Sequence, residues 1–187
     1  MSTPSLELDS KILNNLEEIK FIEDFMKQND DFYKNKNLRL KLIYRMTRDG
    51  KELNDFKKLS DGVVDNLLLI KSHRGYRFGG FCSSPWNMGT FVRESKSFCF
   101  SIDKKRIYKA IKGAKTHVCG NFPRFYGVDT YECDMLTIYK SQNGIISGVC
   151  GPKNNESFEG QEEDYEMNGG YRGFDLLEWE LFKLIFI

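Results

Sequence analysis

Short segments with the residue pattern of β-strands recur from residue 38 onward, and they constrain the fold of this chain more than any other feature. In residues 38–44 leucines alternate with charged residues, which places Leu38, Leu40 and Leu42 on one face of a strand. Further strand signals lie at residues 67–70, 76–81, 97–102, 135–139, 145–150 and 174–186. Too few helical segments separate these strands for a parallel sheet. We therefore predict a sheet-dominated α+β fold with antiparallel strands.

The first helix is predicted at residues 8–28, where apolar side chains recur with the period of a helix. Asp9 or Ser10 would cap its start. A coiled-coil arm would have the same pattern, but Glu23 interrupts the apolar stripe after about two heptads. We therefore expect this helix to pack on the domain's own sheet.

Two further helices and one loop are expected. Residues 52–59 have apolar side chains at three-residue intervals, as a short surface helix would. Residues 103–115 follow a strand signal, and Asp103 is placed to cap a helix there. The segment 151–173 is rich in Gly, Asn and Glu, so we predict a mobile loop.

Glycines mark positions where the backbone needs a special shape. Gly50 follows an aspartate in a turn, Gly79 and Gly80 lie inside a strand signal, and Gly127 lies near a later strand. The pair at 79–80 predicts a bulge or a close approach of another backbone. Because no helix follows it, this pair does not have the arrangement of a phosphate-binding loop.

The net charge of the chain allows nucleic-acid binding only through a local cluster of basic residues. Lys and Arg number 28, Asp and Glu 27, and the formal net charge is +1. Such a chain has no overall field that would hold it on a polyanion. A basic cluster consists of Lys104, Lys105, Arg106, Lys109, Lys112 and Lys115. On a helix at 103–115, residues 105, 109 and 112 would share one face, so a stress-responsive nucleic-acid-binding regulator is the alternative function.

The five cysteines carry no metal or disulfide pattern. Zinc could in principle use His117, Cys119, Cys133 and Cys150, but their spacing is not that of a zinc site, and we predict no metal and no cofactor. Cys82 follows a glycine pair but has few histidines to serve as a base, so a structural thiol is favoured. Cys99 alternates with two phenylalanines and is expected on an exposed face, which keeps a redox role as a hypothesis.

Glu178 and Glu180 flank Trp179 and would point the same way from a strand, about 7 Å apart. A pair of carboxylates at this spacing can do acid–base work. A solvated sheet face is the more common reason for such a pair, and the sequence favours it.

Several weak motifs occur in a fixed order along most of the chain. They are residues 42–45 (LIYR), 48–50 (RDG), 75–81 (GYRFGGF), Trp86, 97–101 (SFCFS), 125–129 (FYGVD), 134–138 (DMLTI) and 174–182. In this order and spacing the chain resembles the TLDc domain family over about residues 38–183. The resemblance implies a two-sheet antiparallel β-sandwich flanked by a few helices. It divides the chain into an N-terminal helix and connector at residues 1–37 and a TLDc-like domain at residues 38–187.

The resemblance also implies a function. It indicates a non-enzymatic role in resistance to oxidative stress, with binding and regulation of the vacuolar proton-pumping ATPase. In such a domain Glu178 and Glu180 would lock the final strand or meet the partner. We expect the partner surface at loops of the sandwich ends, with Trp86, Phe91 and Arg93 in the loop 83–93 beside Pro85, and near Tyr165 and Tyr171.

The ends and the hydropathy of the chain predict its location. Residues 1–8 contain no basic stretch followed by an apolar run, and no segment has the length and apolar character of a membrane span. We therefore expect a cytoplasmic protein without an integral membrane segment, and leave open the nucleus and the surface of an organelle.

Overall fold

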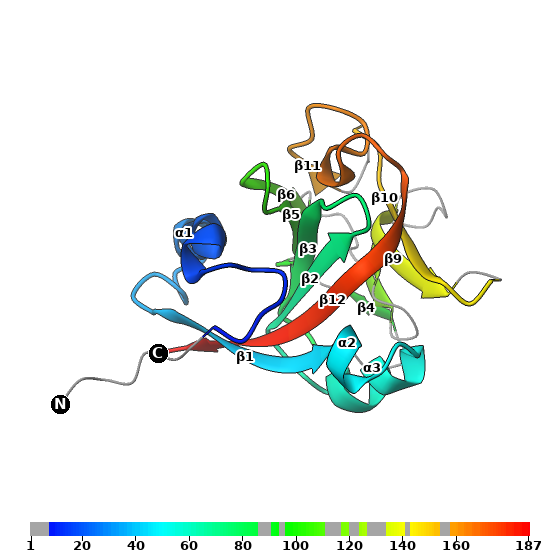
Figure 1. Cartoon of the computed structure of the whole chain (residues 1–187). Coiled ribbons are helices and arrows are strands. Elements are labelled where there is room, and N and C mark those ends of the chain that lie inside the picture. The colour runs from blue at the N-terminus through cyan, green and yellow to red at the C-terminus, as the bar shows by residue number, and fades with distance from the viewer. Residues whose placement is uncertain are drawn as a thin grey trace.

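The computed structural model describes residues 8–85, 91–93, 96–110, 117–119, 124–126, 134–140, 143–153 and 158–187 (Figure 1). The strands are β1 Leu38–Arg45, β2 Asn66–Ser72, β3 Arg77–Cys82, β4 Phe91–Arg93, β5 Phe98–Ser101, β6 Arg106–Ala110, β7 His117–Cys119, β8 Arg124–Tyr126, β9 Asp134–Lys140, β10 Ile146–Cys150, β11 Phe158–Glu159 and β12 Gly173–Phe186. The helices are α1 Lys20–Asn29, α2 Met46–Asp49 and α3 Leu53–Ser60, with 3₁₀ turns η1 Leu16–Ile19 and η2 Glu166–Asn168. The sheet-dominated α+β class is confirmed.

The described strands form one antiparallel sheet in the order β11-β6-β5-β3-β2-β12-β10-β9-β8-β7-β4, with β1 also paired to β12. The long strand β12 is the centre of this sheet, because it pairs with β2 on one side and with both β1 and β10 on the other. Figure 1 shows it in red, crossing the whole molecule. The expected sandwich of two separate sheets is not confirmed, since the strands follow one another in a single curled sheet.

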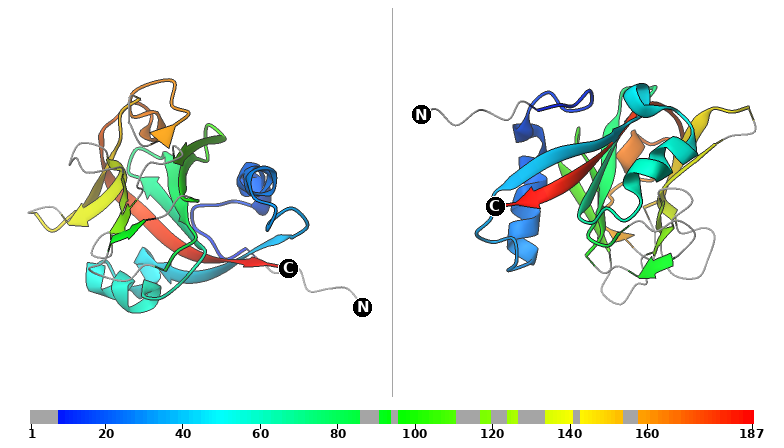
Figure 2. Two further views of the ribbon diagram at one scale, coloured as in Figure 1. Left: turned by 180° about the vertical axis from the view of Figure 1, so that it is seen from behind. Right: turned by 90° about the horizontal axis from the view of Figure 1, so that it is seen from below.

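The curl of the sheet encloses one core and leaves a second on its outer face. Inside the curl, Phe125 of β8 meets Gly80 of β3, two strands that lie far apart in the sheet order. Buried side chains of this inner core include Phe78, Tyr108 and Trp179. The outer core lies between the sheet and the N-terminal segment. Figure 2 shows α1 beside the sheet on the face away from β9 and β10.

The N-terminal helix is shorter than the sequence predicts. Residues 8–15 are not helical, and only η1 and α1 carry the predicted turns, with α1 ending at Asn29 as expected. Ser10 does not cap a helix of residues 8–28. Its Oγ accepts the amides of Ile12 and Leu13 at 3.0 and 2.9 Å and donates to a carboxylate of β12, which gives this segment a turn instead.

The predicted packing of this helix on its own sheet is confirmed. Phe25 of α1 meets Phe98 of β5 edge-on at 5.0 Å between ring centroids, and Ile22 and Met26 are buried beside them. Arg77 of β3 also connects the N-terminal segment to the sheet, because its guanidinium donates to Glu18 at 2.8 Å and to Asp103 at 2.9 Å. The described residues contain no helix long and apolar enough to cross a membrane.

The bond between Arg77 and Glu18 predicts a small pH dependence of stability. Burial alone would raise the pKa of Glu18, but hydrogen bonds from the Asn14 amide and from Arg77 outweigh it and hold this pKa below its usual value. A lowered folded-state pKa stabilises the fold above the unfolded pKa, and this stabilisation is lost as pH falls through the folded pKa. We therefore expect Glu18→Gln to lower stability at neutral pH by roughly 1 kcal/mol or less.

Urea unfolding at a series of pH values checks this prediction. The stability gap between Glu18→Gln and the parent chain should begin to close as pH falls below about 4.3, the usual pKa of a glutamate, and should vanish only below the lowered folded-state pKa of Glu18. Glu17→Gln is the matched control, since Glu17 is exposed and adjacent, and it should follow the parent at every pH. A constant gap between Glu18→Gln and the parent down to strongly acidic pH would contradict the assignment.

The segment 151–173 contains more structure than the predicted mobile loop. Its described part includes β11, paired to β6, and η2, whose three residues Glu166, Met167 and Asn168 are buried. Two cations from the β5–β6 turn and β6, Lys104 and Arg106, reach the Glu166 carboxylate at 3.6 and 3.3 Å. This segment therefore closes one end of the inner core.

Candidate functional site

Glu178 and Glu180 lie in the interior, where the sequence favoured a solvated face. Glu178 is 4% exposed and Glu180 is 0% exposed. Strand β12 is covered on both faces around Trp179, because the N-terminal segment packs on one side and α2 and α3 lie near the other (Figure 1). The prediction of a solvated pair is therefore wrong, because both glutamates are buried.

Three donors hold the Glu180 carboxylate. Oε1 accepts the Arg45 Nε–H at 2.7 Å and the Lys11 amide at 2.9 Å, and Oε2 accepts the Ser10 hydroxyl at 2.6 Å. Arg45 also donates through Nη2 to Asp9 at 2.7 Å. Burial would lower the pKa of Arg45, but its bonds to Glu180 and Asp9 outweigh this and raise it, so the guanidinium stays charged.

Glu178 is held by a different residue, Thr47 at the start of α2. The Thr47 hydroxyl donates to Oε2 at 2.5 Å and its amide approaches Oε1 at 3.3 Å, while Lys11 Nζ donates to the Thr47 hydroxyl at 2.9 Å. We call the six residues Ser10, Lys11, Arg45, Thr47, Glu178 and Glu180 the polar clasp. The polar clasp joins the N-terminal segment, the end of β1 and β12, and its bonded carboxylates serve structure.

The described part of the basic segment, residues 103–110, is a turn and a strand where the sequence predicted a helix. Residues 106–110 form β6 and pair with β5, and Lys105 occupies the left-handed region at φ 50° in the turn. Residues 105 and 109 therefore do not share a helix face. Three of the cations pair with the acidic segment that follows: Lys104 with Glu163 and Glu166, Arg106 with Glu162 and Glu166, and Lys109 with Glu159. These pairs neutralise much of the basic patch required for the alternative of nucleic-acid binding.

The described thiols are buried. Cys99 is not on an exposed face as predicted, because both faces of β5 are covered, and burial raises the pKa of Cys99 and of Cys150. A raised thiol pKa lowers the thiolate fraction and so the reactivity. Cys82 is also buried. In the part of the chain that is described, no three His, Cys, Asp or Glu side chains gather to hold a metal ion.

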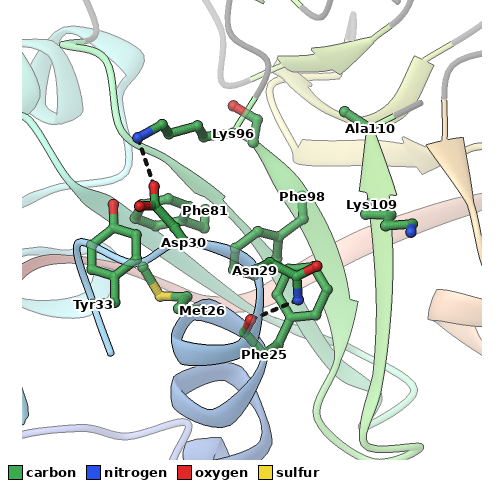
Figure 3. A pocket seen from close by; sticks show the side chains of 11 residues that line it. Phe25, Met26, Asn29, Asp30, Tyr33, Phe81, Lys96, Phe98, Lys109 and Ala110 are labelled. Atoms are coloured by element: carbon green, nitrogen blue, oxygen red, sulfur yellow. Dashed lines mark hydrogen bonds and ion pairs between the residues drawn. The ribbon is translucent and has the colours of Figure 1, made fainter. Parts of the chain in front are cut away.

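A pocket of about 200 Å³ opens between α1 and the sheet (Figure 3). Phe25 and Met26 of α1 face Phe81 of β3 and Phe98 of β5 across it, and Tyr33 closes one side. Four aromatic rings therefore form most of the apolar part of the wall. The volume suits one apolar side chain or a small aromatic group, and it is below the range of drug-sized ligand sites.

Polar groups line the mouth of this pocket. Lys96 Nζ donates to Asp30 at 2.6 Å, which links the sheet side to the end of α1. The Asn29 amide bonds to the Phe25 carbonyl at 2.8 Å and lies at the rim. Ser97, 2% exposed, also lines the pocket, and its Oγ has no hydrogen-bond partner in the structure. A group bound here could accept a hydrogen bond from that hydroxyl.

Sequence reasoning missed this pocket and named other positions. The pocket joins residues 25–33 to residues 81–110, and the only signal for it was the apolar alternation around Phe98. Of the positions named from the sequence, Trp86, Lys112, Lys115, Gly127 and Cys133 lie outside the described residues, as do the side chains of Phe91, Arg93, His117 and Cys119. Tyr171 is exposed beside the Arg74 guanidinium, 4.1 Å from its ring centroid, so those partner positions stay predictions.

Comparison with known proteins identifies the family of the chain. A comparison with curated proteins found no match. The family model of the TLDc domain matches residues 6–182, which is nearly the whole chain and includes the N-terminal helix as well as the polar clasp. The chain therefore belongs to the TLDc domain family.

Proposed function

We propose that this chain is a non-enzymatic protein-interaction module of the stress response, which binds and regulates the vacuolar proton-pumping ATPase and protects against oxidative stress. Membership in the TLDc domain family supports a non-enzymatic stress-response role. The partner is the one that the family resemblance implies. The surface offered for contact includes the pocket between α1 and the sheet.

The proposal is supported by the finding that the carboxylates and thiols that could do chemistry are buried or hydrogen-bonded within the fold. Glu178 and Glu180, the pair that could have done acid–base work, accept hydrogen bonds from residues of the polar clasp. The Cys99 and Cys150 thiols are buried with raised pKa values. By contrast, the pocket has an aromatic wall and an unpartnered Ser97 hydroxyl, as an anchor site for a partner side chain would have.

A pull-down with the full chain, followed by binding to the purified ATPase, tests the proposal. We expect ATPase subunits in the eluate and a saturable signal with the purified complex. Asn29→Trp places an indole at the pocket mouth from an exposed position and should weaken binding roughly tenfold, the loss expected for one buried anchor. Gln28→Trp is the control, because Gln28 is exposed on the same turn and does not line the pocket.

The outcomes separate the candidate functions. Absence of binding to the purified ATPase would remove it as the partner. Recovery of chromatin or RNA in place of ATPase subunits would favour the nucleic-acid alternative, provided that the signal falls steeply with salt. Equal binding by both tryptophan variants would exclude the pocket as the contact.

A further inference from the structure

Strand β1 has an open backbone edge. Asn37 and Ile187 exchange both of their backbone hydrogen bonds, at 2.7 and 3.1 Å, and the antiparallel register with β12 continues through Arg39 and Lys41. In such a ladder the residues between the bonded ones turn their N–H and C=O groups to the other side. These residues are Leu38, Leu40 and Leu42. Among the described residues, β12 is the only strand that pairs with β1.

The edge has defined ends. At one end the register shifts between Leu42 and Tyr44, and α2 follows directly after β1. At the other end lies the connector before Leu38. Figure 1 and Figure 2 both show β1 and β12 side by side, with the start of β1 near the C-terminus and its end at α2. The open stretch is therefore about five residues long, enough for one short added strand.

The side chains of this edge differ between its two faces. Leu38, Leu40 and Leu42 lie on the face of the outer core, and each is only partly buried. On the opposite face, Arg39 and Lys41 are exposed and Lys183 is partly exposed. An added strand would meet leucines on one face and cations on the other, because its side chains alternate in the same way.

The three cations lack compensating charge. Lys41 and Lys183 are directly opposite one another across the β1–β12 ladder. Like charges in this position destabilise a pair of strands. No carboxylate of the described residues lies within ion-pair distance of Arg39, Lys41 or Lys183, although 17 other such contacts occur in the same residues. An acidic partner on this face would remove the repulsion.

From these two observations we infer that β1 binds an extended acidic segment of a partner protein by strand addition, with apolar and acidic residues in alternation. The partner's acidic side chains lie beside Arg39 and Lys41, and its apolar side chains lie beside Leu38, Leu40 and Leu42. Backbone hydrogen bonds supply the affinity and the alternating charges set the register. A second copy of this chain fits worse, because β1 against β1 brings cations together. The inference deepens the proposed interaction function and rests on it.

A peptide series tests the edge directly. The probe is a fluorescein-labelled peptide with leucine and glutamate in alternation, seven residues long, titrated with the full chain and followed by fluorescence anisotropy. We expect saturable binding, weakened roughly tenfold by the double change Arg39→Glu and Lys41→Glu, since two attractive cross-strand pairs become repulsive. The double change Lys51→Glu and Lys57→Glu alters net charge equally on exposed residues after β1 and should leave binding unchanged.

A second pair of peptides tests the backbone bonds. Both carry the same sequence with N-methyl groups, in one at the residues whose amides face β1 and in the other at the residues between them. Only the first should lose binding, because only its methyl groups remove donors from the added ladder. A parent peptide that fails to bind, equal losses from the two methylation patterns, or equal binding by the Arg39→Glu, Lys41→Glu variant overturns the inference. The inference is also overturned if sedimentation analysis shows that the parent chain forms a homodimer and that the Arg39→Glu, Lys41→Glu variant does not.

The peptide experiments and the ATPase-binding experiment can fail independently of one another. If the Arg39→Glu, Lys41→Glu variant loses the peptide but still binds the purified ATPase at parental strength, the ATPase remains the partner and the β1 edge is not its contact. If the parent chain binds the peptide but not the ATPase, the edge remains and another acidic partner takes that role.

Discussion

Replacing Arg45 with alanine is expected to lower the free energy of unfolding by about 3–5 kcal/mol, the loss typical of a broken buried ion pair. The change leaves the Glu180 carboxylate, which is 0% exposed, without its charged partner. The remaining bonds from the Ser10 hydroxyl and the Lys11 amide are neutral donors and cannot replace the guanidinium. Urea unfolding followed by tryptophan fluorescence measures the loss, because Trp179 is buried in the fold and becomes exposed when the chain unfolds.

Arg48→Ala is the matched control for this prediction. Arg48 lies three residues further along the chain and also pairs with an aspartate, but its side chain is 45% exposed. An exposed pair of this kind contributes about 0–1 kcal/mol. Equal losses from the two alanine variants, or a loss below about 1 kcal/mol for Arg45→Ala, would show that the polar clasp does not hold the fold together.

Gly79→Ala is expected to destabilise the chain by roughly 3 kcal/mol, at the upper end of overpacking effects. A Cβ at Gly79 would overlap the Leu68 carbonyl oxygen on the neighbouring strand β2 and also touch the Phe100 ring. The obstacle is backbone at the centre of the sheet, so it cannot move aside as the tip of a side chain would. Thermal and urea unfolding of the variant measure the effect.

Gly173→Ala provides the control for the glycine prediction. Gly173 begins β12, lies outside the left-handed region, and a Cβ there would meet only the Gly148 carbonyl oxygen at 4.0 Å. Alanine should therefore change stability by about 0.5 kcal/mol or less. If Gly79→Ala were as stable as Gly173→Ala, the backbones of β2 and β3 would have to move apart to admit the methyl group at little cost, which would contradict the prediction.

Sequence periodicity predicted most of the strands because their apolar pattern is local. Leucines alternating with charges in β1, the continuous apolar run of β2 and the aromatic alternation of β5 each define a strand without knowledge of its neighbours. The local pattern does not predict which strands pair with one another. The curl of the sheet depends on β12 pairing with β1, β2 and β10, which are far from it in sequence.

The wrong helix at 103–115 shows where local propensity fails. Lysine and alanine favour helices, and Ile107 and Ala110 have helical spacing. In the structure the adjacent Ile107 and Tyr108 face opposite sides of the sheet, Ile107 opposite Phe100 and Tyr108 opposite Cys99. Tertiary pairing with β5 outweighs the propensity, and the left-handed Lys105 makes the turn.

The acidic pair could not be placed from the sequence for a different reason. Glu178 and Glu180 have the spacing of a solvated strand face, and the residues that cover them are Thr47 and Arg45, more than 130 positions earlier. Arg45 and Ser10, which bind Glu180, belong to no sequence motif that would mark them as its partners. Only the fold brings them to β12.

The position of β12 also determines when this protein can fold during synthesis. Every other described strand leaves the ribosome before β12, yet β1, β2 and β10 all need it as a neighbour. Until residues 173–186 emerge, these strands expose unpaired edges and apolar faces that invite association between nascent chains. Folding is thus expected to be late and cooperative, with chaperone protection needed over most of translation.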